Sequence, residues 1–441
     1  MPRLYAKIKF MSKSVSFYTL GCRLNQTETA SLQNSFEKNG YRVVDADQSS
    51  DIVVINTCTV TEGGDADTRR LVYKANRINP QTRIALIGCQ AQVQKEKLTG
   101  LPNVRWVVGN ERKLDLAAIL NEIPDPQSPQ VITPTIQRAP FTQPVAAIDR
   151  QHTRANLKIQ DGCDFFCTFC EIPYARGRAR SRVFEDIFIE ALQLVEAGHR
   201  EIVLTGINIG TYADQGKNLL DVILELEKIP GLARIRISSI EPTTIPRKLI
   251  SLMTPEHKLC RYLHIPIQSG DDSVLSKMER RYTVSEFKSF IEWAHEAVPE
   301  ICLGTDVIVG FPGESEESFS NTENLLQELP LDYFHVFSYS SRTMTKSRNF
   351  QENVSSQAIK SRSERLRDLG QRKRRLLHDS LLGTMQSVLF EEKKDGLWLG
   401  LTDNYVRVSV QSSENLYNQI REVNLESINQ SGITGKIYDR L

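Results

Sequence analysis

The 441-residue sequence contains no run of about 18 apolar residues, so it predicts no membrane-spanning helix. It also lacks an excess of either charge, because 55 Lys and Arg residues oppose 54 Asp and Glu residues. That balance excludes a chain that is basic throughout, although it can hide a local basic patch. Residues 1–15 are basic but lack the continuous apolar segment of a secretory signal, and Met11 is an alternative start. We therefore expect a cytoplasmic protein with no membrane partner.

Eight cysteines need an explanation, because disulfide bonds are rare in the cytosol. Three lie within eight residues, three are spread singly over the first 90 residues, and two lie alone in the second half. In that order the groups are Cys163, Cys167 and Cys170, then Cys22, Cys58 and Cys89, and finally Cys260 and Cys302. The last two have no partner pattern, so we predict that they are core residues.

Residues 12–122 alternate short apolar runs with helical patterns, which predicts a domain built on a parallel sheet covered by helices. Cys22, Cys58 and Cys89 each follow the end of a predicted strand. Ligands bind at that edge of open α/β sheets, so the three thiols are predicted to converge on one site. Such a site suits an iron–sulfur cluster or zinc. The alternative is that the three cysteines are small apolar residues packed in the sheet.

Residues 123–149 contain six prolines and no helical period, which predicts an extended linker. The domain predicted over residues 150–380 contains six β/α repeats between residues 155 and 340. This α/β pattern is typical of a partial (β/α)6 barrel with parallel strands. A doubly wound sheet would show the same periodicity and remains an alternative.

The last predicted domain, residues 381–441, alternates apolar and polar residues between turn signals, which predicts a small antiparallel β-barrel. Before it, residues 356–382 form one amphipathic helix. Between Lys360 and Arg375 this helix carries eight Lys and Arg residues against two acidic residues. A basic helix beside a small barrel suggests phosphate contacts with RNA, although a solvated helix face gives the same charge pattern.

The spacing of Cys163, Cys167 and Cys170 is a metal-site pattern, because three thiolates so close together ligate a single centre. Structural zinc requires four ligands, yet no His or Cys occurs within 25 residues after Cys170, and His152 is the nearest upstream. A cubane held by three cysteines leaves one iron open to a ligand. The motif also follows the first predicted barrel strand at its carboxyl end, where active sites of such barrels lie. The alternative is a zinc knuckle or incidental thiols.

This motif resembles that of the radical S-adenosylmethionine superfamily. Phe169, just before the third cysteine, matches the superfamily's aromatic beside the cofactor's adenine. The resemblance implies that the methionyl group of the cofactor chelates the open iron, and that one electron then cleaves its sulfonium to give a deoxyadenosyl radical. It also implies an electron donor such as a flavodoxin- or ferredoxin-type reductant.

The wider sequence is similar to the methylthiotransferase family over nearly its whole length. Three segments are similar to the branch that acts on N6-threonylcarbamoyladenosine beside the tRNA anticodon: Thr19–Glu28, Asn56–Thr61 and Ile172–Arg182. The resemblance implies an enzyme with two 4Fe–4S clusters, S-adenosylmethionine, a tRNA partner and a C-terminal TRAM-like barrel. It gives the N-terminal cysteines an auxiliary cluster, which delivers the sulfur transferred to C2 of the adenosine at position 37.

The sequence departs from the family pattern at three places, namely Glu171, Gly63–Gly64 and residues 340–346. These departures concern the substrate more than the two cluster sites. One alternative is therefore methylthiolation of N6-isopentenyladenosine in tRNA or of a ribosomal protein side chain. A second alternative is a non-catalytic iron–sulfur or zinc protein that binds RNA.

Further candidate site residues follow predicted barrel strands. We predict that Gly206, Ser239, Glu241 and Gln268 contact the cofactor, whereas His264 is predicted to be a satisfied strand histidine. Four arginines alternate after the cysteine motif and are predicted to recognise phosphate or carboxylate groups of the substrate. They are Arg176, Arg178, Arg180 and Arg182.

Overall fold

A computed structural model describes residues 13–143, 153–430 and 432–438. The chain divides into two compact units. The N-terminal unit contains the described residues up to Gln137 together with Tyr174–Arg176, and the C-terminal unit contains the rest. The segments 123–143 and 153–380 therefore contribute to both units. His152 and Met11, which entered the sequence predictions, lie outside the described residues.

The N-terminal unit is built on a six-stranded parallel sheet with the order β2-β1-β3-β4-β5-β6. Its strands are β1 (Ser14–Thr19), β2 (Arg42–Val43), β3 (Ile52–Thr57), β4 (Arg83–Gly88), β5 (Val104–Val108) and β6 (Gln130–Ile132). Its helices are α1 (Arg23–Lys38), α2 (Glu62–Ile78), α3 (Cys89–Val93), α4 (Lys95–Thr99) and α5 (Leu116–Glu122). The parallel sheet was predicted, but β6 lies within the stretch predicted to be a linker.

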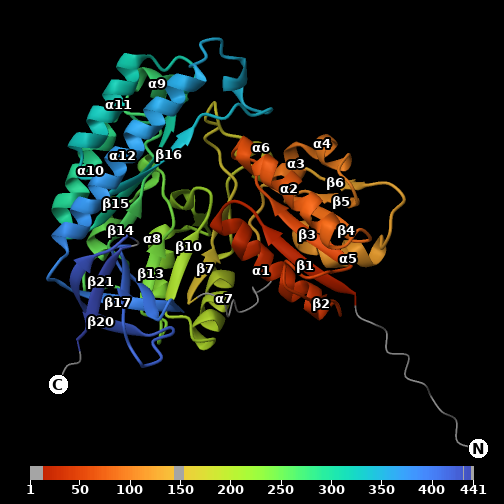
Figure 1. Cartoon of the computed structure of the whole chain (residues 1–441), viewed down its shortest axis with the longest axis horizontal. Coiled ribbons are helices and arrows are strands. Elements are labelled where there is room, and N and C mark those ends of the chain that lie inside the picture. The colour runs from red at the N-terminus through yellow and green to blue at the C-terminus, as the bar shows by residue number, and fades with distance from the viewer. Residues whose placement is uncertain (1–12, 144–152, 431, 439–441) are drawn as a thin grey trace, which may run out of the picture. The chain divides into compact units, whose positions relative to one another are not determined.

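Helices cover both faces of this sheet (Figure 1). On one face, α1 and α5 bury residues such as Phe36 and Leu120 against Phe17 and Val54. On the other face, α2, α3 and α4 pack against Ile55 and its neighbours. Burial on both faces explains why the strands are continuous Val and Ile runs rather than alternating patterns.

The C-terminal unit contains six parallel barrel strands in two sheets, β13-β10-β7 and β14-β15-β16. An isolated parallel bridge pairs Ile235 of β13 with Leu259, just before β14, and so links the two sheets. The six strands are β7 (Arg154–Lys158), β10 (Glu201–Thr205), β13 (Arg234–Ile237), β14 (Tyr262–His264), β15 (Cys302–Val309) and β16 (Tyr333–Ser338). The partial (β/α)6 barrel predicted from the repeats is therefore confirmed.

Helices alternate with these strands and cover the outside of the barrel (Figure 1). They are α7 (Phe184–Glu196), α8 (Leu219–Leu226), α9 (Asp272–Lys277), α10 (Val284–Ala297), α11 (Glu316–Glu328) and α12 (Ser356–Ser380), while α6 (Ile172–Arg176) follows the cysteine motif. Short strands β8 (Gln160–Asp161), β9 (Arg180–Ser181), β11 (Ala213–Asp214) and β12 (Lys217–Asn218) form two small pairs. Polar caps fix the helix starts, as where Thr283 and Glu286 form a capping box on α10.

The last five strands close into a small barrel in the order β17-β18-β19-β21-β20. They are β17 (Met385–Lys394), β18 (Leu397–Thr402), β19 (Arg407–Val410), β20 (Ile420–Ile428) and β21 (Ile433–Ile437). The predicted barrel is present, although β19 and β21 pair in parallel because the chain crosses over to close it. Buried Arg234 and Arg236 of β13 donate hydrogen bonds to the carbonyls of Leu401 and Thr402, which ties this barrel to the (β/α)6 barrel.

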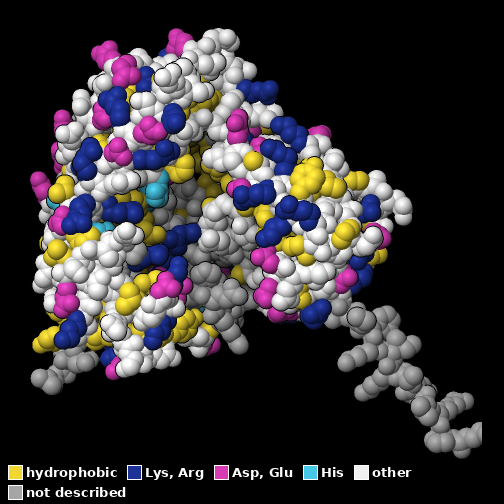
Figure 2. Space-filling model, in the orientation of Figure 1, with side chains coloured by type: hydrophobic (Ala, Val, Ile, Leu, Met, Phe, Trp, Pro, Cys, Tyr) yellow, Lys and Arg dark blue, Asp and Glu magenta, His cyan; other side chains and the backbone are white. Residues whose placement is uncertain are grey.

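The basic helix α12 pairs much of its charge within the C-terminal unit. Arg362 binds Glu314 at 2.6 Å and Glu316 at 3.0 Å, and Arg365 binds Glu316 and Glu323. Figure 2 accordingly shows acidic and basic side chains interspersed over α10, α11 and α12 rather than a continuous basic stripe. Among the described residues, no helix combines the length and apolar character needed to cross a membrane.

Candidate active site and cluster sites

The three cysteines of the motif lie on the loop between β8 and α6. The loop is folded back on itself, since the Cys163 amide donates to the Gly177 carbonyl at 3.1 Å and the Cys170 amide donates to the Cys167 carbonyl at 2.9 Å. Phe166 within the loop has a left-handed φ of 52°, which is unfavourable for a bulky residue and is typical of strained functional sites.

The three thiols lie close enough to repel each other as thiolates. Burial is the main reason that the pKa of Cys163 rises to about 11, and the neighbouring Cys167 thiolate adds to the increase. Burial likewise raises the pKa of Cys170, with further increases from Cys167 and Cys163. Without a cation these groups are neutral thiols, and a bound metal centre would stabilise all three thiolates. The donor set therefore fits a metal or iron–sulfur centre.

Arg280 supplies a permanent positive charge to this site and was not predicted from the sequence. Its Nη1 donates to the sulfur of Cys167 at 3.3 Å, and its Nη2 donates to the carboxylate of Glu241. Burial raises the pKa of Cys167, and the Arg280 charge opposes that rise. Glu241, predicted as a cofactor contact, is thus an anchor for Arg280 in this structure.

Two more predicted cofactor residues, Phe169 and Gly206, lie in the cysteine loop and at the carboxyl end of β10. Phe169 packs edge-to-face against Phe311, with ring centroids 6.5 Å apart. Gly206 follows β10, and a Cβ there would lie 2.5 Å from the Ile209 side chain, so no larger residue fits. Their roles toward a cofactor remain predictions.

Two more predicted residues flank β14. Ser239 donates a long hydrogen bond of 3.4 Å to the carbonyl of His264. Gln268 has a left-handed φ of 72°, and its backbone bonds to both Asp306 and Ile308 of β15. The chain after β14 thus takes a left-handed conformation at Gln268 while still pairing with β15, which places strain at the barrel edge.

The three N-terminal cysteines follow neighbouring strands, as predicted. Cys22 caps the start of α1 after β1, Cys58 follows β3, and Cys89 begins α3 directly after β4. The sheet order places β1, β3 and β4 side by side, and a Cβ on Gly21 would lie 2.8 Å from the Cys58 sulfur. Burial and the charges of Cys89 and Cys22 raise the pKa of Cys58 to about 11. The three thiols therefore form a second convergent set.

A buried polar group lies next to this set in the N-terminal unit. Glu28 on α1 binds Arg176 at 3.0 Å and also pairs with Lys113, and all three side chains are at most 3% exposed. Lys113 donates to Asn110, whose amide donates to the Cys89 sulfur at 3.6 Å. Two cations thus share one carboxylate, and Arg176 lowers the pKa of Cys58 against the effect of burial.

The four alternating arginines do not form one substrate-facing row. Arg176 and Arg182 are completely buried. Arg176 forms an ion pair with Glu28, and Arg182 forms ion pairs with Asp186 and Glu190. The predicted substrate role therefore does not suit these two residues, because both guanidinium groups are enclosed in the protein and paired with its own carboxylates. The other two are less enclosed: Arg178 is 55% exposed and lies over the Phe166 ring, and Arg180 lies 3.6 Å from Asp161.

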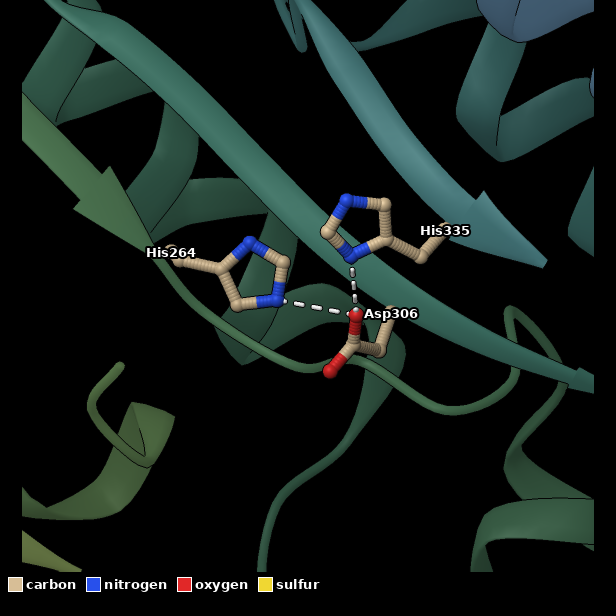
Figure 3. Close-up of side chains that lie close together, drawn as sticks. All are labelled: His264, Asp306 and His335. Atoms are coloured by element: carbon tan, nitrogen blue, oxygen red, sulfur yellow. Dashed lines mark hydrogen bonds and ion pairs between the residues drawn. The ribbon is translucent and has the colours of Figure 1, made fainter. Parts of the chain in front are cut away.

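A third polar group lies on β14, β15 and β16 (Figure 3). His264 Nε2 lies 2.9 Å and His335 Nδ1 lies 3.1 Å from the same oxygen, Oδ1 of Asp306. Burial would raise the pKa of Asp306, but the hydrogen bonds from both imidazoles outweigh it and hold the pKa well below its usual range. His264 was predicted to be a satisfied strand residue, and it does have two polar partners.

Some of the missed residues carry a readable signal. Asn110 and Lys113 follow β5 at the same edge as the cysteines. They could have been predicted from the tendency of ligands to bind at the carboxyl edge of a parallel sheet. Asp306 and His335 each adjoin a buried apolar residue, Val307 and Phe334, which marks the inner face of a barrel strand. Arg280 lies in a loop without any pattern and could only be found from the structure.

Comparisons with known proteins agree with this geometry. Residues 157–326 match the Radical SAM superfamily, and residues 14–109 match Uncharacterized protein family UPF0004. The chain is 38% identical to threonylcarbamoyladenosine tRNA methylthiotransferase MtaB of Aquifex aeolicus, over 89% of this chain and 96% of that protein. It is 37% identical to MtaB of Bacillus subtilis over 93% of each chain.

A second group of relatives carries another name. The chain is 32% identical to tRNA-2-methylthio-N(6)-dimethylallyladenosine synthase of Thermodesulfovibrio yellowstonii, over 88% of this chain and 91% of that protein. Among solved structures, the radical S-adenosylmethionine methyltransferase TsrM of Kitasatospora setae superposes with a TM-score of 0.56 at 15% identity, over 74% of this chain and 73% of that one. That similarity concerns the fold alone. Sequence identity over almost the full length, together with the radical SAM match, shows that the chain belongs to the radical S-adenosylmethionine methylthiotransferase family.

Proposed function

We propose that this enzyme attaches a methylthio group to C2 of N6-threonylcarbamoyladenosine at position 37 of tRNA. The observation that carries the proposal is the pair of convergent cysteine sets, each at the carboxyl edge of a parallel sheet. A methylthiolation needs both a means to activate an unreactive C–H bond and a source of sulfur. Two separate three-thiolate sites supply one centre for each task.

The residues divide between the two tasks as follows. Cys163, Cys167 and Cys170 hold the cluster that binds S-adenosylmethionine, and the N-terminal cysteines hold the auxiliary cluster. When bound, these groups supply the radical chemistry that removes hydrogen from C2 and the sulfur that replaces it. Arg280 and Arg176 hold positive charge beside the two thiolate sets, which favours the anionic ligands.

Binding of cofactor and substrate falls to residues around the first cluster. Phe169, Gly206, Ser239 and Gln268 would line the S-adenosylmethionine site, while Glu241 holds Arg280 in place. A flavodoxin- or ferredoxin-type protein would supply the electron. The exposed Arg178 is the arginine best placed for the acidic substituent of the nucleoside or for tRNA phosphate.

Nucleoside mass spectrometry tests the substrate directly. The chain is expressed in a bacterial strain without methylthiotransferases of its own, and its tRNA is digested and analysed. We expect the methylthio form of N6-threonylcarbamoyladenosine with the natural chain and none with Cys167→Ala. Cys260→Ala removes a buried thiol outside both sets and should retain the product.

Dimethylallyladenosine is the second candidate substrate, because relatives at 30–34% identity are named for it. Appearance of only its methylthio form in the same digest would replace the first proposal. Absence of both products, with full iron content in the purified chain, would contradict tRNA adenosine as the substrate.

A further inference from the structure

The group His264, Asp306 and His335 lies on the inner face of three neighbouring barrel strands. Leu263, Val307 and Phe334 on the same strands belong to the apolar core under the outer helices. Because side chains alternate along a strand, the neighbours of these residues point to the opposite face, into the barrel. Three donor side chains from three different strands therefore meet inside the barrel (Figure 3).

The geometry points to a binding site for one divalent transition-metal ion held by His264, Asp306 and His335. All three ligand atoms lie within 4.8 Å of one another. Metal–nitrogen and metal–oxygen bonds of about 2.1 Å place adjacent ligand atoms about 3.0–3.4 Å apart in octahedral or tetrahedral sites. The two separations from Asp306 Oδ1, 2.9 and 3.1 Å, need little adjustment to reach that range.

The surroundings of His264 are those of a metal ligand. Its Nδ1 is 2.9 Å from the hydroxyl of Tyr333, which in turn is 2.7 Å from the hydroxyl of Tyr262. In the metal-bound form, Nδ1–H can donate a hydrogen bond to the tyrosine hydroxyl, and the Nε2 lone pair is then available to the metal. Metal-ligating histidines are oriented by such a second hydrogen bond. The imidazole of His264 is only 7% exposed, so its direction is fixed by its surroundings.

The site is nevertheless open on one side. The side chain of Asp306 is 24% exposed and that of His335 is 55% exposed. Two imidazoles and one carboxylate provide three ligands, which leaves positions for water or an oxygen ligand of a bound molecule. This donor set suits zinc, iron(II) or cobalt(II) rather than magnesium or calcium, which prefer oxygen ligands throughout.

Another His–carboxylate pair in the same unit provides a matched control. His257 Nδ1 lies 2.9 Å from Glu227, the same separation as in the candidate site, and its side chain is 32% exposed. No third donor joins this pair among the groups found in the described residues. His257→Ala thus removes an equivalent histidine without touching the candidate site.

Zinc binding to the enzyme with both clusters assembled tests the inference. Zinc is the probe because its X-ray absorption edge is separate from that of the cluster iron. We expect about one zinc per chain with only nitrogen and oxygen neighbours near 2.0–2.1 Å. Asp306→Asn and His335→Ala should weaken zinc binding by a factor of 100 or more, and Tyr333→Phe by about 10. His257→Ala should bind as the natural chain does.

The iron content of each variant separates loss of the site from loss of the fold. His335 is exposed, so His335→Ala should keep the iron content of the natural enzyme. Zinc with sulfur neighbours near 2.3 Å would assign the metal to cysteines and overturn the inference. The same conclusion follows if the enzyme binds no zinc, or if Asp306→Asn and His335→Ala bind it as tightly as His257→Ala. Tests of the tRNA substrate are independent of these outcomes.

Discussion

The buried carboxylate of Glu28 is predicted to control the stability of the N-terminal unit. Its two oxygens accept hydrogen bonds from Arg176 at 3.0 and 3.1 Å, and it also pairs with Lys113. Glu28→Gln keeps the shape of the side chain but leaves two buried cations without their anion. Breaking a buried pair from one side costs about 3–5 kcal/mol.

Amide hydrogen exchange measures this loss within one unit of a two-unit protein. The central amides of β3 and β4 are fully buried, so their slowest exchange reports opening of the N-terminal unit. A loss of 3–5 kcal/mol corresponds to exchange that is faster by roughly two to three and a half powers of ten. Exchange in β15 of the other unit should not change and serves as an internal reference.

Two companion variants test whether charge is the cause. Glu37→Gln makes the same substitution at an exposed position of the same helix and should leave exchange unchanged. Adding Lys113→Met to Glu28→Gln removes one of the two unbalanced cations and should recover part of the loss. If Glu28→Gln changes exchange by less than tenfold, or if Lys113→Met makes the loss larger, the charge argument is wrong.

Three further predictions concern the thiol sites. Cys22→Ala should lower the iron content from about eight to about four per chain, whereas Cys260→Ala should keep about eight. Arg280→Gln removes a positive charge from a cluster ligand and should lower the reduction potential of that cluster, measured by EPR titration in the Cys22→Ala background; an unchanged or higher potential would contradict this. In cluster-free protein, alkylation of Cys58 and Cys163 should rise about tenfold per pH unit from pH 7 to about 10, because both thiols titrate near 11. A plateau by pH 9 would indicate ordinary thiols.

The predicted fold depended on patterns that persist over many residues. Continuous Val and Ile runs predicted the parallel sheet, six repeats predicted the barrel, and alternation predicted the small C-terminal barrel. The three-residue strand β6 was missed because its only signal lay among prolines. The contact between the two barrels through Arg234 and Arg236 could not be predicted either. The sequence around an arginine does not identify a hydrogen-bond acceptor that lies far away in the chain.

The cysteine sets were predictable because the ends of parallel strands share one edge. The arginine row was harder, because alternate spacing predicts a common face only in an extended segment. Here the row begins in α6, turns at Gly177 with a φ of 76°, and enters β9. Arg176 and Arg178 therefore differ completely in exposure although they are two residues apart.

Both thiol sets have an arginine held by a carboxylate beside them, and this common arrangement has a chemical consequence. Arg176 is fixed by Glu28, and Arg280 is fixed by Glu241. A guanidinium keeps its charge at any physiological pH, so it offsets thiolate charge whether or not a cluster is present. A lysine or histidine in the same place could lose its proton when the site is empty and buried. The permanent charge therefore favours the thiolate forms and keeps the pKa values of Cys58 and Cys167 lower than burial alone would make them.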